Sequence, residues 1–194
     1  RQEVDYETLW DTEVHLGKLN DYDWLHLHHE DFTGQHGKFY RSHRNSKWYK
    51  EQKIQFQDIA SKLGYPSIHE HKKGISRIIK NYVKDGGFLF AMCSATDSYD
   101  IALAMGNIDG VEAVYDGTPT NPDLQNSLDY SQCFAFENFK IISDPMIYEF
   151  SDIDFPPSHN PITRGAKADY FTLFEFSAKY DPVPSMLTQN PVSY

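Results

Sequence analysis

Five consecutive apolar residues, Phe88 to Met92, lie between a pair of glycines and Cys93. An apolar run of this length, without alternating polar residues, is typical of a strand that is covered on both faces, as in a parallel sheet between layers of helices. Residues 93–98 predict a turn, and the apolar spacing that follows predicts a helix from Tyr99 to Met105. A buried strand, a turn and a helix in succession predict an α/β fold.

The residues around Cys93 suit a nucleophile elbow, in which a reactive side chain occupies a tight turn between a strand and a helix. Such a turn needs small residues two positions before and two positions after the nucleophile, and Ala91 and Ala95 occupy these positions. The N-terminus of the following helix would stabilise a thiolate at Cys93. Cys93 is therefore the candidate catalytic residue; the alternative is a small buried side chain at a strand end. Cys133 lies in an expected aromatic strand and is expected to belong to the core.

A second expected strand, Asp23 to His29, also ends in polar residues. Because the carboxyl ends of parallel strands border one crevice, we expect residues beyond this strand to line a pocket with Cys93. The expected lining residues are His28, His29, Glu30 and Asp31, together with Ser94, Thr96 and Asp97 of the turn after Cys93.

The histidines of this strand leave two other interpretations open. His26 and His28 point to the same side of a strand, so with Glu30 they can present two imidazoles and a carboxylate to one metal ion. The other interpretation is structural: histidines that are hydrogen-bonded at the end of a strand. The remaining histidines show no recognised spacing of metal ligands.

Periodic apolar residues predict two helices before the apolar strand. One helix begins after Asn45 or Ser46 and runs to about Leu63, and the next has an apolar stripe and is closed by Asp85-Gly86-Gly87. Beyond Gly106 the pattern changes to turns and short aromatic segments, which predict β-rich decoration or an edge of the sheet. The strands expected there are Cys133 to Phe136, Ile147 to Phe150 and Tyr170 to Phe176.

Charge and composition exclude several classes of protein. The net charge of −10, without a basic stripe, argues against binding of nucleic acid. No run of about 18 apolar residues predicts a membrane span. Two cysteines do not make a disulfide framework for 194 residues, a length that fits one domain. The expected partner is a small-molecule substrate or ligand, whereas the oligomeric state and the compartment stay open.

Three stretches resemble a family of bacterial proteins labelled asparagine synthetase B: YDWLHLHHEDFTGQ at 22–35, GGFLFAMCSATDSYD at 86–100 and YFTLF at 170–174. The domain of that family is similar to class I glutamine amidotransferases and to trehalose-utilisation proteins. The resemblance implies a flavodoxin-like, open and mainly parallel sheet with helices on both faces, and Cys93 as the nucleophile. It also implies a single domain of which residues 1–194 are the middle part, truncated at both ends. We expect no cofactor, and a choice between the bacterial cytoplasm and periplasm stays open.

The chain departs from the amidotransferase pattern in three respects. That pattern has a later His and Glu that activate the cysteine, but His159 and Glu175 lie sixteen residues apart, so we expect the general base to come from outside this chain. The glycine-rich loop that forms an oxyanion hole is replaced by His28 to Asp31, with Gly34 as the nearby glycine. Nothing resembles the ATP-pyrophosphatase part of a genuine asparagine synthetase.

The sequence therefore favours a cysteine-dependent amidotransferase-like or amidohydrolase-like protein whose substrate is unknown. One alternative is a non-catalytic module of the same fold that binds a carbohydrate or another small ligand. A weaker alternative is a metallohydrolase that uses His26, His28 and Glu30.

Overall fold

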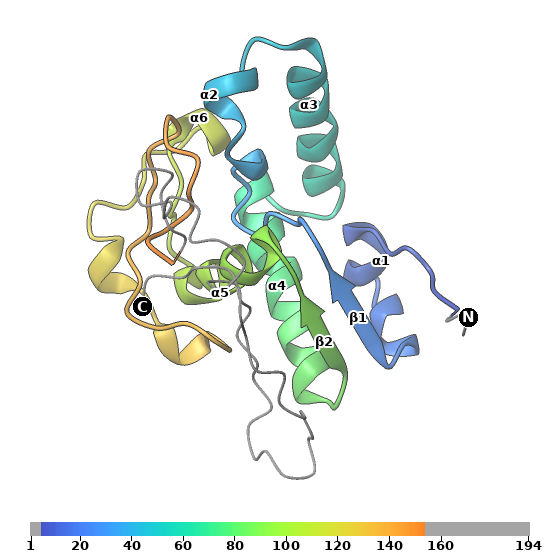
Figure 1. The fold of residues 1–194 in the computed structure, drawn as a ribbon. Coiled ribbons are helices and arrows are strands. Elements are labelled where there is room, and N and C mark those ends of the chain that lie inside the picture. Colours follow the sequence, from blue (N-terminus) through green and yellow to red (C-terminus); the bar gives the residue numbers. More distant parts are fainter. Residues whose placement is uncertain (1–4, 154–194) are drawn as a thin grey trace, which may run out of the picture.

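The computed structural model describes residues 5–153 and shows a mixed α/β arrangement (Figure 1). Two strands, several long helices and a loop-rich C-terminal part follow one another along the chain. The elements, in order, are α1 (Asp11–His15), a 3-10 turn (Lys18–Asp21), β1 (Trp24–Leu27), a 3-10 turn (His36–Lys38), α2 (Tyr40–His43), α3 (Lys47–Lys62), α4 (Ile68–Lys84), β2 (Phe88–Ala91), α5 (Ser94–Met105), α6 (Ala113–Asp116) and 3-10 turns at Gln125–Ser127 and Tyr130–Gln132.

The two strands lie side by side and run parallel, with Trp24 opposite Phe88 and Leu27 opposite Ala91. They form the only sheet found among the described residues. Both expected strands are thus confirmed, each somewhat shorter than predicted. The two expected helices before the apolar strand are confirmed as α3 and α4. None of the helices within residues 5–153 has the length and apolar character needed to cross a membrane.

One face of the sheet packs against α4 and α5. The side chains of Leu25, Leu27, Leu89 and Ala91 contact a core cluster that includes Ile75, Ile79 and Tyr82 of α4 and Ala95, Tyr99, Ala102 and Leu103 of α5. This burial of apolar side chains is the main source of stability at the centre of the fold.

The opposite face of the sheet, here called the aromatic face, consists of Trp24, His26, Phe88 and Phe90. Trp24 and Phe88 are 56% and 50% exposed, and their rings meet edge to face with centroids 5.8 Å apart. His26 and Phe90 form the neighbouring ring pair, at 5.2 Å. The expectation of strands covered on both faces is therefore not confirmed by residues 5–153, whose helices α4 and α5 pack on the opposite face.

Helix α4 owes its position to a cap and to close packing at its end. The Ser67 hydroxyl accepts a hydrogen bond from the Glu70 amide at 3.1 Å, which satisfies one of the free amides of the first turn. At the other end, Gly87 packs directly under the ring of Tyr82. A Cβ at residue 87 would lie 2.2 Å from that ring, so only glycine permits this approach of β2 to α4.

Helix α5 begins at Ser94, five residues earlier than the sequence pattern predicts. The expected turn over residues 93–98 is therefore wrong, because the chain reverses within the single residue Cys93 and the polar residues after it already belong to the helix. Ser94 and Thr96 are residue types that favour turns, but short polar side chains are also common in the first turn of a helix.

Residues 106–153 fold around a second core cluster that includes Ile101 and Met105 of α5 with Phe139, Phe150 and Ile153. The strands expected at 133–136 and 147–150 are wrong: this region contains short helices, loops and one isolated antiparallel bridge, Ile141 with Ser151. The expected β-rich decoration is thus not seen in this region. The strand expected at Tyr170–Phe176 lies outside the described residues.

A buried carboxylate explains why residues 133–136 do not form a strand. Asp100 accepts hydrogen bonds from the amides of Phe134, Ala135 and Phe136 at 2.8, 2.7 and 2.9 Å. These amides are satisfied by one side chain of α5, so the segment needs no neighbouring strand.

Three buried lysines tie the loops of the C-terminal part to the remainder of the molecule. The Lys38 ammonium donates to the carbonyl oxygens of Ile142 and Asp144 at 2.8 and 3.0 Å. Lys73 donates to the carbonyl of Ile108 at 2.7 Å, and Lys80 to that of Gln132 at 2.7 Å. Burial lowers the pKa of Lys38 to about 8, despite the nearby carboxylates of Asp31 and Asp144.

Candidate functional site

Cys93 occupies a one-residue turn between β2 and α5, with φ 55° and ψ −138°. This left-handed conformation is uncommon for a residue with a side chain, and such conformations cost of the order of 1–3 kcal/mol. The side chain is exposed and forms no disulfide. The geometry therefore holds a thiol at the carboxyl end of β2, at the start of a twelve-residue helix.

The small residues around the turn have clear packing roles. The amide of Met92 donates to the Leu27 carbonyl at 3.0 Å, so the strand pairing continues up to the turn. Ala95 is completely buried, and its amide donates to the Met92 carbonyl at 3.2 Å. A larger side chain at residue 95 would push the first turn of α5 away from the sheet.

The start of α5 supplies a free amide beside the thiol. The first amides of any helix lack partners within the helix. Here the Ala95 amide donates to Met92 and the Thr96 amide donates to the Cys93 carbonyl at 3.0 Å, an oxygen that also accepts from the Thr96 hydroxyl. The Ser94 amide is the remaining donor at the positive end of the helix dipole.

The register of the sheet aligns the end of β1 with the end of β2. Leu27 lies opposite Ala91 in the last pair of the register, and His28 and His29 follow β1 just as Met92 and Cys93 follow β2. Both imidazoles are exposed, with ring centroids 3.9 Å apart. The exposed Glu30 carboxylate accepts a hydrogen bond from the His28 amide at 2.5 Å.

Ser98 joins this loop to α5. Its hydroxyl donates to the Glu30 carbonyl at 3.0 Å and accepts from the Phe32 amide at 3.3 Å. The structure therefore places the loop after β1 next to the helix after Cys93, which is the neighbourhood that the sequence predicts.

The remaining expected lining residues differ in their surroundings. Ser94 and Thr96 are partly exposed, whereas Asp97 is only 2% exposed and faces the interior. The Asp31 carboxylate accepts from the amides of Thr33 and Gly37 at 2.7 and 2.8 Å, so it shapes its own loop.

Gly34 in that loop permits a close approach to α4. Its φ is 78°, and a Cβ would lie 2.7 Å from the Cα of His69 in α4. His69 itself is buried; its Nδ1 lies 2.7 Å from the Thr33 carbonyl oxygen, and its Nε2 accepts from the Gly110 amide. This pairing fits a neutral imidazole with its proton on Nδ1, in agreement with the lowered pKa that burial gives His69.

Sequence reasoning missed the left-handed run His36-Gly37-Lys38. All three residues have positive φ, between 53° and 63°, and Gly37 is the only signal for this conformation in the sequence. The ring of His36 stacks on Phe56 with centroids 6.1 Å apart, and its Nε2 is buried without a hydrogen-bond partner. Burial lowers the pKa of His36 to about 4.

Among residues 5–153 no three His, Cys, Asp or Glu side chains are arranged to hold a metal ion. His26, His28 and Glu30 therefore do not form the expected ligand set. His26 instead places its Nε2 3.3 Å from the sulfur of Met92.

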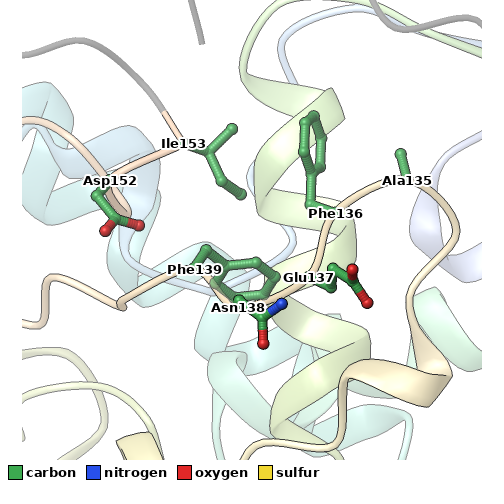
Figure 2. A pocket seen from close by; sticks show the side chains of 7 residues that line it. All are labelled: Ala135, Phe136, Glu137, Asn138, Phe139, Asp152 and Ile153. Carbon is green, nitrogen blue, oxygen red and sulfur yellow. The ribbon is translucent and has the colours of Figure 1, made fainter. Parts of the chain in front are cut away.

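Two hollows lie away from Cys93. The larger, of about 510 Å³, is shown in Figure 2 and is lined by residues 135–139 together with Asp152 and Ile153. The smaller, of about 360 Å³, lies beside the C-terminal end of α5 and includes Arg77 and Lys80. Cys93 lines neither of them. The case for the Cys93 site therefore depends on the backbone of the turn and on the neighbouring groups.

Cys133 provides an internal comparison. It is partly buried against the second core cluster, and its thiol donates to the Asp100 carbonyl at 3.3 Å. Burial and the nearby Asp100 raise its pKa, which keeps the thiol protonated. The expected core position of Cys133 is confirmed, although it does not lie in a strand.

No protein-family model, curated protein or solved structure matches this sequence.

Proposed function

We propose that this chain is part of a cysteine-dependent amidotransferase-like or amidohydrolase-like protein, in which Cys93 attacks an amide or a similar carbonyl carbon. The observation that carries the proposal is the exposed thiol in a strained one-residue turn between a parallel strand and a helix. The proposal includes a flavodoxin-like fold, in which β1 and β2 belong to the sheet and α4 and α5 to a layer of helices on it.

The proposed chemistry follows from the groups around Cys93. The sulfur of the thiolate forms a bond to the carbonyl carbon, and the oxygen that gains negative charge accepts a hydrogen bond from the Ser94 amide. The carbon–nitrogen bond then breaks, and the nitrogen leaves as an amine after it takes up a proton. Water hydrolyses the resulting thioester to a carboxylic acid and restores the thiol.

The proposal keeps the general base outside this chain and assigns His29 to the lining of the pocket. His29 lies two residues beyond the end of β1, as Cys93 lies two residues beyond the end of β2, and its imidazole is exposed.

Labelling with iodoacetamide between pH 6 and 7 tests the first step of the proposal. We expect Cys93 to react at least about tenfold faster than Cys133, because reactivity follows the thiolate population and the exposure of the sulfur. The rates are measured by peptide mapping of the 1–194 chain, with Cys93→Ser and Cys133→Ser as assignment controls. Equal and slow labelling of both cysteines would contradict the proposal.

A second candidate function is a non-catalytic module that binds a carbohydrate or another small polar ligand. It is favoured by the larger hollow, which joins the rings of Phe136 and Phe139 to the polar side chains of Asn138 and Asp152 (Figure 2). A thermal-shift screen with sugars and with amides separates the two candidates. Stabilisation by a sugar in both the Cys93→Ser variant and the unmodified chain, without turnover of amides, would favour the binding module.

A further inference from the structure

We infer that His26, His28 and Met92 form a binding site for the soft metal ion Cu(I) on the aromatic face of the sheet. The inference does not depend on the chemistry of Cys93. It starts from one contact between the two strands: the Nε2 atom of His26 lies 3.3 Å from the thioether sulfur of Met92. These residues are 66 positions apart in the sequence, and the parallel pairing of β1 with β2 brings them together.

The alternation of side chains along the strands places both donors on one face. His26 follows Trp24 by two residues in β1, and Met92 follows Phe90 by two residues, just beyond the end of β2. Because successive side chains of a strand point to opposite faces, both donors project from the aromatic face and away from the core. The His26 imidazole is exposed and Met92 is only partly buried, so a dissolved ion can reach the pair.

The geometry of this contact suits two ligands of one metal ion. A metal ion binds imidazole nitrogen at about 2.0 Å and cysteine sulfur at about 2.3 Å, and we take a similar length for the thioether. With these bond lengths, donors 3.3 Å apart subtend an angle of about 100° at the ion, which is near the tetrahedral value. As a hydrogen bond the contact is weak, because a thioether sulfur is a poor acceptor. A cation between the two atoms would bind the lone pairs of both.

The chemistry of the donors favours Cu(I) among the common metal ions. Thioether sulfur is a soft ligand that selects Cu(I), and imidazole also binds copper. Mg²⁺ and Ca²⁺ prefer oxygen ligands, and protein zinc sites use thiolate, imidazole and carboxylate. The ring of Phe90, with its centroid 5.2 Å from that of the His26 ring, adds an aromatic surface that attracts cations.

His28 supplies the third ligand. Its ring centroid lies 6.4 Å from that of His26. Two imidazoles on one ion have centroids roughly 5–6 Å apart, given metal–nitrogen bonds of about 2.0 Å. A small rotation of the exposed His28 side chain is therefore sufficient. The resulting set of two imidazoles and a thioether lacks the carboxylate of Glu30 that the sequence predicts as a ligand.

Anaerobic titration with Cu(I), in competition with the coloured chelator bicinchoninate, tests the inference. The reference protein is the 1–194 chain with Cys93→Ser and Cys133→Ser, because thiols bind Cu(I) by themselves. We expect the reference to bind one equivalent of Cu(I). In this background Met92→Leu, His26→Phe and His28→Phe should each weaken binding at least about tenfold, as the loss of a ligand costs no less than the loss of a group that only orients one.

Met146→Leu is the matched control. It removes a thioether outside the site, from a side chain that is 42% exposed, and should leave the affinity for Cu(I) unchanged. The ε-methyl NMR signals of the reference protein provide a second measurement, which needs no variant at the site. On addition of one equivalent of Cu(I), the signal of Met92 should shift while that of Met146 stays in place.

Three results would overturn the inference. The reference protein would show no saturable binding of one equivalent, or any of the three ligand variants would keep the full affinity, or Met146→Leu would lose as much affinity as Met92→Leu. If a ligand variant does not fold, the reference protein still decides the matter. An unshifted Met92 methyl signal at one equivalent of Cu(I) then refutes the site.

Discussion

Cys93 adopts a backbone conformation that most residues avoid, and this conformation directs its sulfur outward. The sequence shows this position through the apolar strand before it and the alanines on either side of it. The angle itself is set by the meeting of β2 and α5, where the amides of Met92 and Ala95 are already paired. The energy stored at this residue can be measured by substitution.

We expect Cys93→Gly to raise the free energy of unfolding by about 1 kcal/mol relative to Cys93→Ser, because glycine adopts a φ of 55° without a steric penalty. Both variants lack the thiol, so the comparison isolates the backbone term. Urea unfolding of the two variants provides the measurement. If glycine at residue 93 gives no gain over serine, the turn is not strained.

The buried imidazole of His36 is a second single residue with a measurable effect, because it makes the stability of the fold depend on pH. Its pKa is about 4 in the folded chain, first because of burial and with Lys53 adding to the effect, against 6.5 for an ordinary histidine. Between these values the unfolded chain binds a proton that the folded chain does not. The contribution of neutral His36 to the free energy of unfolding is therefore fully present above pH 6.5 and is lost as the pH falls towards 4.

We expect acidification from pH 7 to pH 4 to remove up to about 3 kcal/mol of stability through His36, and His36→Phe to abolish this part of the slope. Urea unfolding at several pH values measures the slope, with the exposed His28→Phe as a control. The lowered pKa values of His69 and His71 should leave a residual slope of the same sign. Identical slopes for the unmodified chain and His36→Phe would disprove the assignment.

At the scale of elements, the apolar periodicity of the sequence predicted the helices and strands that pack on the core. It did not predict the residue at which α5 begins. The apolar stripe of α4 and the apolar run of β2 were visible because each side chain there contacts the same core. The start of α5 was misplaced because Ser94 and Thr96 read as turn residues, although they form the first turn of the helix. The close contact between α4 and β2 was visible only as a glycine pair.

Gly87→Ala tests that contact. We expect it to lower the free energy of unfolding by about 2 kcal/mol, since a Cβ at residue 87 would lie 2.2 Å from the ring of Tyr82. In a double-mutant cycle with Tyr82→Ala, the cost of the added methyl group should fall to less than half, because the obstructing ring is gone. Additive effects in urea unfolding would show that the ring is not the obstacle.

At the scale of the whole molecule, contacts between residues far apart in the sequence determine the conformation of segments that local sequence patterns mispredict. The aromatic segments at 133–136 and 147–150 favour strands. In the first segment, however, the amides donate hydrogen bonds to the carboxylate of Asp100, which lies more than thirty residues earlier in the sequence. The candidate site is similar. Its Cys93 and the polar end of β1 were predicted together, whereas the buried side chain of Asp97 and the loop-bracing role of Asp31 depend on packing that no local pattern encodes.

Asp100→Ala should destabilise the molecule by about 3 kcal/mol or more, because three amides near the core would lose their acceptor. Asp129→Ala, which removes an exposed carboxylate that accepts from the Ser131 amide, is the matched control and should destabilise the molecule much less. Thermal and urea unfolding measure both effects. Similar losses in the two variants would mean that the Asp100 contacts contribute little.

The three lysines that bind backbone carbonyls also make the folded chain chemically selective. Amine-acylating reagents reach Lys47 and Lys62 in α3, whose side chains are 88% and 72% exposed, but the amines of Lys38, Lys73 and Lys80 are enclosed by the loops they fasten. Acylation of the assembled molecule therefore leaves these three sites unmodified. Acylation before folding removes the charges that hold the C-terminal part in place, so the order of modification and folding determines whether this part can assemble.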